Sequence, residues 1–435
     1  MDVLTTLKRL ADAKSAQTKA WNATQGLVTA DYDILTTQVA ALRRGELDGE
    51  MSALRDLDGA EMPDTVRNQI LESVKNNEQT VSSVETLSAE SFYGSNIIYV
   101  KGIPATGSNL SRAFANCYSL YAVLGVSFVN AKHANELFKN CCSLRAIKLS
   151  DGDFAKAGIV NSLFEACKSI TGLTLPSGSF AVAADARSMF YGCKSLTGLT
   201  LPEGSFGAVT NANNMFDVCS SLTRLTLPEG SFGAVNDASY MFSGCKALKS
   251  VILPATFSAK SINNAFLNCS SLTNIDLHGM TRQALRMYKL FSDCILLKSV
   301  TGLDLSGLAL TVDDLLNANI GITTNGVEES FSIVVQYLFY NCNSLTDCRL
   351  SGILYKSGVN LQLAKMLSAE SLYSWVKALY DWETNEEGKT TDDEDHVLYM
   401  SASQQQTLTD YSGENGENGE DAYLEAIAKG WTILN

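Results

Sequence analysis

The chain has 435 residues, is 46% hydrophobic and carries 18% charged residues, which is enough for a large core. Its net charge of −14 is uneven: residues 376–435 carry −11, residues 1–85 carry −5, and residues 86–375 carry +2. The middle has no basic stripe, which argues against a nucleic-acid partner, and no apolar run of about 18 residues occurs, which excludes a membrane-spanning helix.

The N-terminal part of the chain is predicted to be helical. Residues 1–45 carry apolar residues at heptad spacing in their second half, which ends on Val39 and Leu42, and Gly26 offers a point of division into two helices. Two interpretations stay open: a helical hairpin packed on its own chain, and a coiled-coil stem that makes a homo-oligomer through residues 1–45. We assign residues 1–85 as an N-terminal helical anchoring or oligomerisation region.

A cysteine then recurs in the fixed frame F-x-x-C-x-S-L-x-x-L-x-L-P. The repeated cysteines are Cys117, Cys141, Cys167, Cys193, Cys219, Cys245, Cys269, Cys294 and Cys342. Successive cysteines are 24 to 26 residues apart except for a last gap of 48, so residues 310–331 are predicted to hide one eroded coil. A regular period of this length is typical of a solenoid.

Two periodicities alternate within each repeat. Ala212, Phe216 and Cys219 have helical spacing, whereas Leu225 and Leu227 have the spacing of a strand that ends at the following proline. Each coil is therefore predicted to contain a short helix, a short strand and a turn. Because one coil buries too little apolar surface to offset the entropy of ordering its backbone, neighbouring coils must complete its core.

The repeated cysteine has three interpretations. Zinc ligation needs cysteines paired at short spacing, and only Cys141 and Cys142 are adjacent. A disulfide ladder suits small secreted domains, and residues stacked at a strand spacing of about 4.8 Å place their Cβ atoms further apart than the roughly 3.8 Å usual in disulfides. We therefore predict buried free thiols inside a column of identical residues.

The repeats "MFYGCKSLTGLTLP" and "YMFSGCKALKSVILP" resemble the BspA-like leucine-rich repeats of bacterial surface proteins. The resemblance covers roughly residues 110–350, and we assign residues 86–359 to this solenoid. It implies an α/β solenoid, a right-handed leucine-rich-repeat superhelix with a parallel sheet on one face. It also implies adhesion or binding without catalysis, because members of the family are mostly cell-surface or secreted proteins.

Residues 360–435 are assigned to a small α+β C-terminal capping module, since the open edge of a solenoid needs a cap. The segment "LAKMLSAESLYSWVKALYDW" is predicted to be a helix whose apolar face includes Met366, Leu372 and Trp375. A strand at "VLYMSA" is predicted to follow, and then a helix and a final strand. Gly430 is predicted to end this helix before the final strand. The segments "LSAESLYSWVKALYDW" and "AIAKGWTIL" are also similar to the C-terminal closing modules of tail-fibre-like proteins of phages and prophages of gut anaerobes.

No catalytic motif is present. The three histidines lie in different regions, and the nucleophile elbow, the zinc-protease helix and the phosphate-binding loop are all missing. The stretch "DWETNEEGKTTDDE" places its glycine two positions late for an EF-hand, which favours an exposed acidic hairpin over a calcium site. Trp375, Trp382 and Trp431 could stack on sugars or fill a core. We expect no enzymatic activity, no metal and no cofactor.

The remaining candidates lie on the outer face of the strands. The positions predicted to point outward are Ala146/Lys148, Gly172/Thr174, Gly198/Thr200, Arg224/Thr226, Ser250/Ile252, Asn274/Asp276 and Asp347/Arg349. We select Arg224, Thr226, Ile252, Asp276 and Arg349 as candidate binding residues, because most of them interrupt an otherwise small and Thr-lined face. This face either docks a glycan or protein loop through many weak hydrogen bonds or is a plain solvated sheet.

Three functions are consistent with these features. The first is an external virion appendage, a head or tail fibre of a phage of gut bacteria. Its N-terminal region would bind other virion proteins, and its solenoid would bind a host-surface protein or glycan. The second is a BspA-like adhesin, secreted or on a bacterial surface; the start "MDVLTTLKRLADAKSAQTKAW" lacks the basic and apolar regions of a signal peptide, so export needs another route or a signal already removed. The third is an intracellular scaffold, which fits the free thiols.

Overall fold

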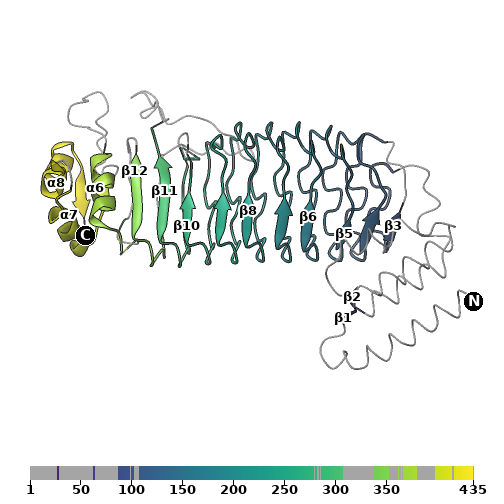
Figure 1. The fold of residues 1–435 in the computed structure, drawn as a ribbon, viewed down its shortest axis with the longest axis horizontal. Coiled ribbons are helices and arrows are strands. Elements are labelled where there is room, and N and C mark those ends of the chain that lie inside the picture. The colour runs from purple at the N-terminus through teal and green to yellow at the C-terminus, as the bar shows by residue number, and fades with distance from the viewer. Residues whose placement is uncertain are drawn as a thin grey trace, which may run out of the picture.

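The computed structural model shows an elongated stack of coils with helices at one end (Figure 1). It describes residues 87–97, 99–101, 107–278, 280–281, 284, 286–306, 338–351, 361, 364, 366–379, 397–413 and 416–434, and the pairs 27–28 and 62–63. Each coil contributes one short strand, and the strands lie side by side along the long axis of the molecule.

In the described coils ten short strands pair in parallel, within four sheets of two or three strands each. They are β3 (Tyr99–Lys101), β4 (Ala122–Leu124), β5 (Ala146–Ile147), β6 (Gly172–Thr174), β7 (Gly198–Thr200), β8 (Arg224–Thr226), β9 (Ser250–Ile252), β10 (Asn274–Asp276), β11 (Ser299–Asp304) and β12 (Asp347–Ser351). Equivalent residues face one another, as Leu173 faces Leu199 and Leu225 faces Val251. The predicted repeat solenoid with short parallel strands is confirmed, and its right-handed sense stays a prediction.

The short helix predicted in each coil is wrong: the described residues between 107 and 306 include no helix. Around Cys219 the backbone N–H groups alternate between two kinds of acceptor. Those of Ala212 and Phe216 donate to carbonyls of the next coil, and those of Met215 and Cys219 donate to carbonyls three residues back in their own coil. Tight turns that also pair with a neighbouring coil satisfy every donor, which an isolated helical turn in a coil would not do.

These turns require residues in the left-handed region. Asn214 has a φ of 56° and Val218 a φ of 60°, and the equivalent pair in the next coil is Tyr240 and Gly244 with 59° and 68°. Turns of type II need a positive φ at their third residue, which explains why two such positions recur in one coil after another. Spacing of apolar residues alone does not distinguish these turns from a helix.

The 48-residue gap does not contain a stacked coil. Strand β11 pairs directly with β12, with Ser299 opposite Asp347, and the ring of Phe291 stacks on that of Phe339 at a centroid distance of 6.2 Å. No coil fits between two strands that are already hydrogen-bonded to each other. The predicted eroded coil is therefore wrong, and the residues between 306 and 338 are an insertion outside the described residues.

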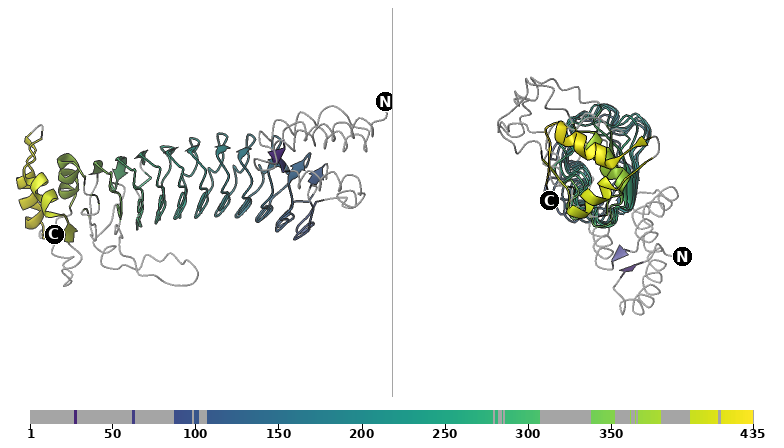
Figure 2. Two further views of the ribbon diagram at one scale, coloured as in Figure 1. Left: turned by 90° about the horizontal axis from the view of Figure 1, so that it is seen from below. Right: turned by 90° about the vertical axis from the view of Figure 1, so that its left-hand side faces the viewer.

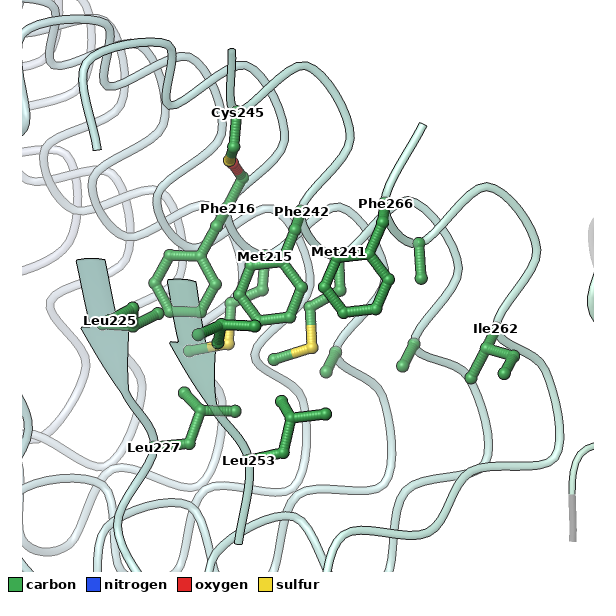
Figure 3. Close-up of a cluster of buried hydrophobic side chains, with 14 of the residues drawn as sticks. Met215, Phe216, Leu225, Leu227, Met241, Phe242, Cys245, Leu253, Ile262 and Phe266 are labelled. Carbon is green, nitrogen blue, oxygen red and sulfur yellow. The ribbon is translucent and has the colours of Figure 1, made fainter. Parts of the chain in front are cut away.

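The core is built from columns of identical side chains (Figure 3). Phenylalanines that precede the repeated cysteines stack through the solenoid, for example Phe190 on Phe216 at 5.4 Å and Phe216 on Phe242 at 5.5 Å. A second column follows the strands, as Phe206 stacks on Phe232 at 5.4 Å. The inward leucines are buried in the same core, so successive coils bury equivalent side chains against their neighbours.

The cysteine column is confirmed as a set of buried free thiols, and it has a further role. Every repeated cysteine donates its Sγ–H to the carbonyl of the phenylalanine in the preceding coil; Cys219 reaches Phe190 and Cys245 reaches Phe216, each at 3.1 Å (Figure 3). Burial raises the pKa of the Cys219 and Cys245 thiols, and that of Cys193 to about 12, so these thiols stay protonated and keep the donor hydrogen. Each thiol thus fills the core and links two coils.

In the N-terminal region the structure describes two pairs of residues. β1 (Leu27–Val28) pairs antiparallel with β2 (Met62–Pro63). The helical repeat predicted to run through Val28 is wrong at this point, because a strand starts directly after Gly26, a residue that is unfavourable in a helix. The rest of residues 1–85 lies outside the described residues, and the anchoring and oligomerisation predictions lie there too.

The C-terminal residues form helices α6 (Ala369–Lys377), α7 (Ala402–Thr409) and α8 (Gly419–Ala428) and the parallel pair β13 (Val397–Tyr399) and β14 (Thr432–Leu434). Helix α6 lies on the last coil, and the end-on view shows the three helices over the end of the solenoid (Figure 2). The indole N–H of Trp375 donates to the Cys348 carbonyl at 2.9 Å, and Ser371 Oγ accepts from the Cys348 N–H at 3.0 Å. The helix therefore satisfies strand groups that a further coil would otherwise pair.

Several details of this region differ from prediction. Met366 is 58% exposed, whereas Leu372 and Trp375 are buried as predicted. Burial of Trp375 and Trp431 excludes both from sugar stacking, and Trp382 lies outside the described residues, as does the acidic stretch considered for calcium. Helix α7 was not predicted, although the capping box formed by Ser401 and Gln404 is a recognisable start signal.

Candidate binding groove on the strand face

The outer face of the strands carries an open groove. Because equivalent residues of successive coils lie in register, the outward side chains form rows along the solenoid axis. A cavity of 1240 Å³ lies over these rows and extends from the coil of β5 to that of β9. We call this cavity the strand-face groove.

The floor of the groove is formed by small residues. Gly172 and Gly198 face each other on β6 and β7, and a side chain added at Gly198 would meet no atom within 4 Å. Outward threonines continue the floor, and Thr174 and Thr200 pair in register with their hydroxyl-bearing side chains exposed. The floor therefore combines exposed backbone with a row of groups that both donate and accept hydrogen bonds.

Charged residues of both signs line the groove. Arg224 begins β8, and Lys148 follows β5 at the end of the groove nearer the N-terminus. The carboxylates of Asp151, Glu203 and Glu229 lie beyond the carboxyl ends of their strands. Within the described part of the chain these five side chains form no ion pair, so their charges remain open to a partner.

The structure brings three of the five candidate residues together and separates two. Arg224, Thr226 and Ile252 line the groove, and Ile252 is 57% exposed. Asp276 instead accepts a hydrogen bond from the His278 backbone N–H at 3.0 Å, outside the groove lining. Arg349 lies still further along, where it pairs with Glu370 of helix α6 at 2.5 Å, so its position is explained by that contact.

Sequence reasoning missed the acidic rim. Glu203 and Glu229 each lie in a copy of the repeated segment "LPEGSF", and Asp151 occupies the equivalent position in its own coil. These positions lie beyond the strand ends, where the alternation of side chains along a strand no longer predicts direction. A recurring charge at one position in a repeat is the signal that would have found them. Ala146, predicted to point outward, is instead fully buried.

The groove has the chemistry of a binding surface. Its hydroxyls, carboxylates, cations and exposed backbone can form many hydrogen bonds. Among the described residues, no group of three His, Cys, Asp or Glu side chains could hold a metal ion. In that part of the chain no helix is long and apolar enough to cross a membrane.

The repeats match a known sequence family. The profile of the BspA type leucine rich repeat region matches the chain in six copies, over residues 67–171, 131–258 and 212–346, which together cover more than half of the sequence. The chain belongs to the BspA-type leucine-rich repeat family. Its members are typically proteins of the cell surface or secreted proteins, and a binding or structural role follows from that membership.

Solved leucine-rich repeat structures show a distant likeness. A leucine rich cell surface protein from Faecalibacterium prausnitzii is 18% identical, with 75% of this chain and 86% of that chain covered and a TM-score of 0.31. A leucine-rich repeat protein from Bacteroides ovatus is 15% identical, with 67% and 84% covered and a TM-score of 0.29. No curated protein sequence matches the chain. The family assignment therefore rests on the repeat profile.

Proposed function

We propose that this BspA-type chain is a non-catalytic binding protein that contacts a host surface through its strand-face groove. The observation that carries the proposal is the groove itself, an open cavity of 1240 Å³ whose lining includes threonine hydroxyls and five charged side chains that form no ion pair, those of Lys148, Asp151, Glu203, Arg224 and Glu229. A rigid solenoid also presents such a surface at little conformational cost.

We propose further that the protein is carried on a phage virion as a head or tail fibre. The support is the similarity of two C-terminal segments to closing modules of tail-fibre-like proteins. In this proposal residues 1–85 bind other virion proteins and residues 360–435 cap the solenoid. The contacts of Trp375 and Ser371 with Cys348 support the capping role, because they satisfy the backbone N–H and carbonyl groups of Cys348 in the last strand of the solenoid.

The second candidate is a bacterial cell-surface or secreted adhesin, and the BspA-type repeats themselves favour it. An antibody against the solenoid is used to probe purified virions and washed bacterial envelopes. This experiment distinguishes the virion fibre from the bacterial adhesin. Signal in virions and none in envelopes supports the fibre. Signal confined to envelopes or culture medium refutes the fibre and supports the adhesin.

Binding through the groove is tested with labelled protein on a panel of gut anaerobes. The variant Gly198→Thr fills the floor with a side chain that has room and suits a strand. Gly158→Thr is the matched control, because a side chain there also meets no atom within 4 Å and lies outside the groove lining. We expect Gly198→Thr to lose binding and Gly158→Thr to keep it; equal binding by both would refute the role of the groove.

A further inference from the structure

Two cations of the groove, Lys148 and Arg224, have a defined spacing. Lys148 belongs to the coil of β5 and Arg224 to that of β8, so three strand spacings, about 14 Å, separate them along the solenoid axis. Between them lies the open floor over Gly172 and Gly198. A ligand that reaches both cations must therefore be extended, lie along the axis and approach the backbone closely.

The charges restrict the ligand further. An arginine guanidinium binds carboxylates through two parallel hydrogen bonds, and a lysine ammonium binds them as a point charge. The carboxylates of Glu203 and Glu229 lie along one rim and repel a densely charged polyanion, while they can accept hydrogen bonds from hydroxyl groups. The groove thus fits a hydroxyl-rich chain that carries a few widely spaced carboxylates.

The lining favours a carbohydrate over a protein segment. Protein interfaces are centred on buried aromatic and apolar anchors, whereas this floor consists mainly of glycine and of threonines such as Thr174, Thr200 and Thr226, with Ile252 as an exposed apolar side chain at one end. The threonines recur at the strand spacing of about 4.8 Å and offer a hydroxyl at each step. No aromatic side chain belongs to the groove lining among the described residues, so stacking on neutral sugar rings is not its mode of binding.

We propose that the strand-face groove binds an acidic oligosaccharide of the uronic-acid type, which lies along the solenoid axis with carboxylates at Lys148 and Arg224. This inference rests on the proposed binding function of the groove and names the chemical class of its ligand. The threonine hydroxyls and the exposed backbone bind the sugar hydroxyls, and Glu203 and Glu229 accept hydrogen bonds along one side.

Isothermal titration of the full chain tests this with two probes. One is a hexasaccharide of alternating glucuronic acid and N-acetylglucosamine, and the other is the neutral hexasaccharide of N-acetylglucosamine. We expect the acidic probe to bind and the neutral probe to bind at least about tenfold more weakly. Arg224→Gln and Lys148→Gln should each weaken binding of the acidic probe about tenfold, because each removes a charge-assisted hydrogen bond. Lys194→Gln, an exposed lysine outside the groove lining, is the matched control and should leave affinity unchanged.

The cell-binding assay separates failure of this inference from failure of the proposed function. If Gly198→Thr abolishes cell binding but the acidic probe neither binds nor competes, the groove still binds a host and the carbohydrate inference is overturned. Loss of cell binding after protease treatment of the cells overturns it as well and identifies a protein partner. If Gly198→Thr binds cells as well as the unmodified protein does, the proposed function itself is refuted.

Discussion

Replacement of one repeated cysteine measures what the column contributes. Cys219 is fully buried in a central coil, and its Sγ–H donates to the Phe190 carbonyl at 3.1 Å. Cys219→Ala removes a buried sulfur, which costs about 1 kcal/mol in transfer free energy with a further increment for the cavity. It also removes one hydrogen bond between coils.

The hydrogen-bond contribution is kept modest by a second donor. The Phe190 carbonyl also accepts the backbone N–H of Cys193 at 3.1 Å, so it is not left unpaired in the variant. Loss of one of two bonds costs about 0.5–1.5 kcal/mol. We therefore expect Cys219→Ala to lower the free energy of unfolding by about 2–3 kcal/mol, a large part of the stability of an ordinary domain.

Urea unfolding followed by circular dichroism is the assay, with the slope compared between variants to confirm that the same surface unfolds. Cys142→Ala is the control, because Cys142 is only partly buried and lies outside the column. Its change should stay within about 0.5 kcal/mol. A loss of less than 1 kcal/mol in Cys219→Ala, or an equal loss in Cys142→Ala, would falsify the interpretation of the column.

Three further outcomes are expected. A thiol reagent at pH 8 should modify Cys142 in the native protein and leave the ten buried thiols unreacted until the chain unfolds; rapid reaction of several would contradict the buried column. Burial raises the pKa of Asp217 to about 6, above its ordinary 3.8, so the stability that this group contributes is complete below pH 4 and lost as the pH rises through 6. Asp217→Asn should thus be more stable than the unmodified protein by about 1–3 kcal/mol at pH 7.5 and equally stable at pH 4. Equal stability of the two proteins at both pH 7.5 and pH 4 would contradict a raised pKa of Asp217. Gly302→Ala should lower the unfolding free energy by at least about 1 kcal/mol in the urea assay, because φ at Gly302 is 69° and the added methyl would lie 2.7 Å from Asp276 Oδ1. Gly302 lies where the register of β11 and β12 shifts, between Val300 and Leu303, and an unchanged midpoint would show that this irregularity relaxes freely.

Features that repeat could be predicted from the sequence. The inward leucines, the phenylalanine before each cysteine and the burial of the thiols follow from the period, because a side chain that recurs at one position meets its own copies in the neighbouring coils. The strand positions followed for the same reason, and Pro228 marked an end as expected. Three of the five candidate residues proved to share the groove because alternation along a strand is a reliable guide to direction.

Features that depend on pairing between coils were decided only by the tertiary structure. The coils contain turns where helices were predicted, because alternate backbone N–H groups donate to carbonyls of the next coil. The spacing of apolar residues does not show which carbonyl a backbone N–H group binds. The gap of 48 residues contains an insertion and no further coil, because β11 and β12 pair directly with each other. The sequence of the insertion by itself does not indicate this pairing. Arg349 does not belong to the candidate site, because it forms an ion pair with Glu370 of helix α6, which sequence analysis did not anticipate.

The sequence by itself determined the family, the period and the composition of the core, because these are properties of one coil repeated. The tertiary structure decided the groove: its floor needs two glycines from different coils in register, and its rims carry charges brought together from the coils of β5, β7 and β8. A binding surface on a solenoid is a property of the stack, since each coil contributes only one or two residues to it.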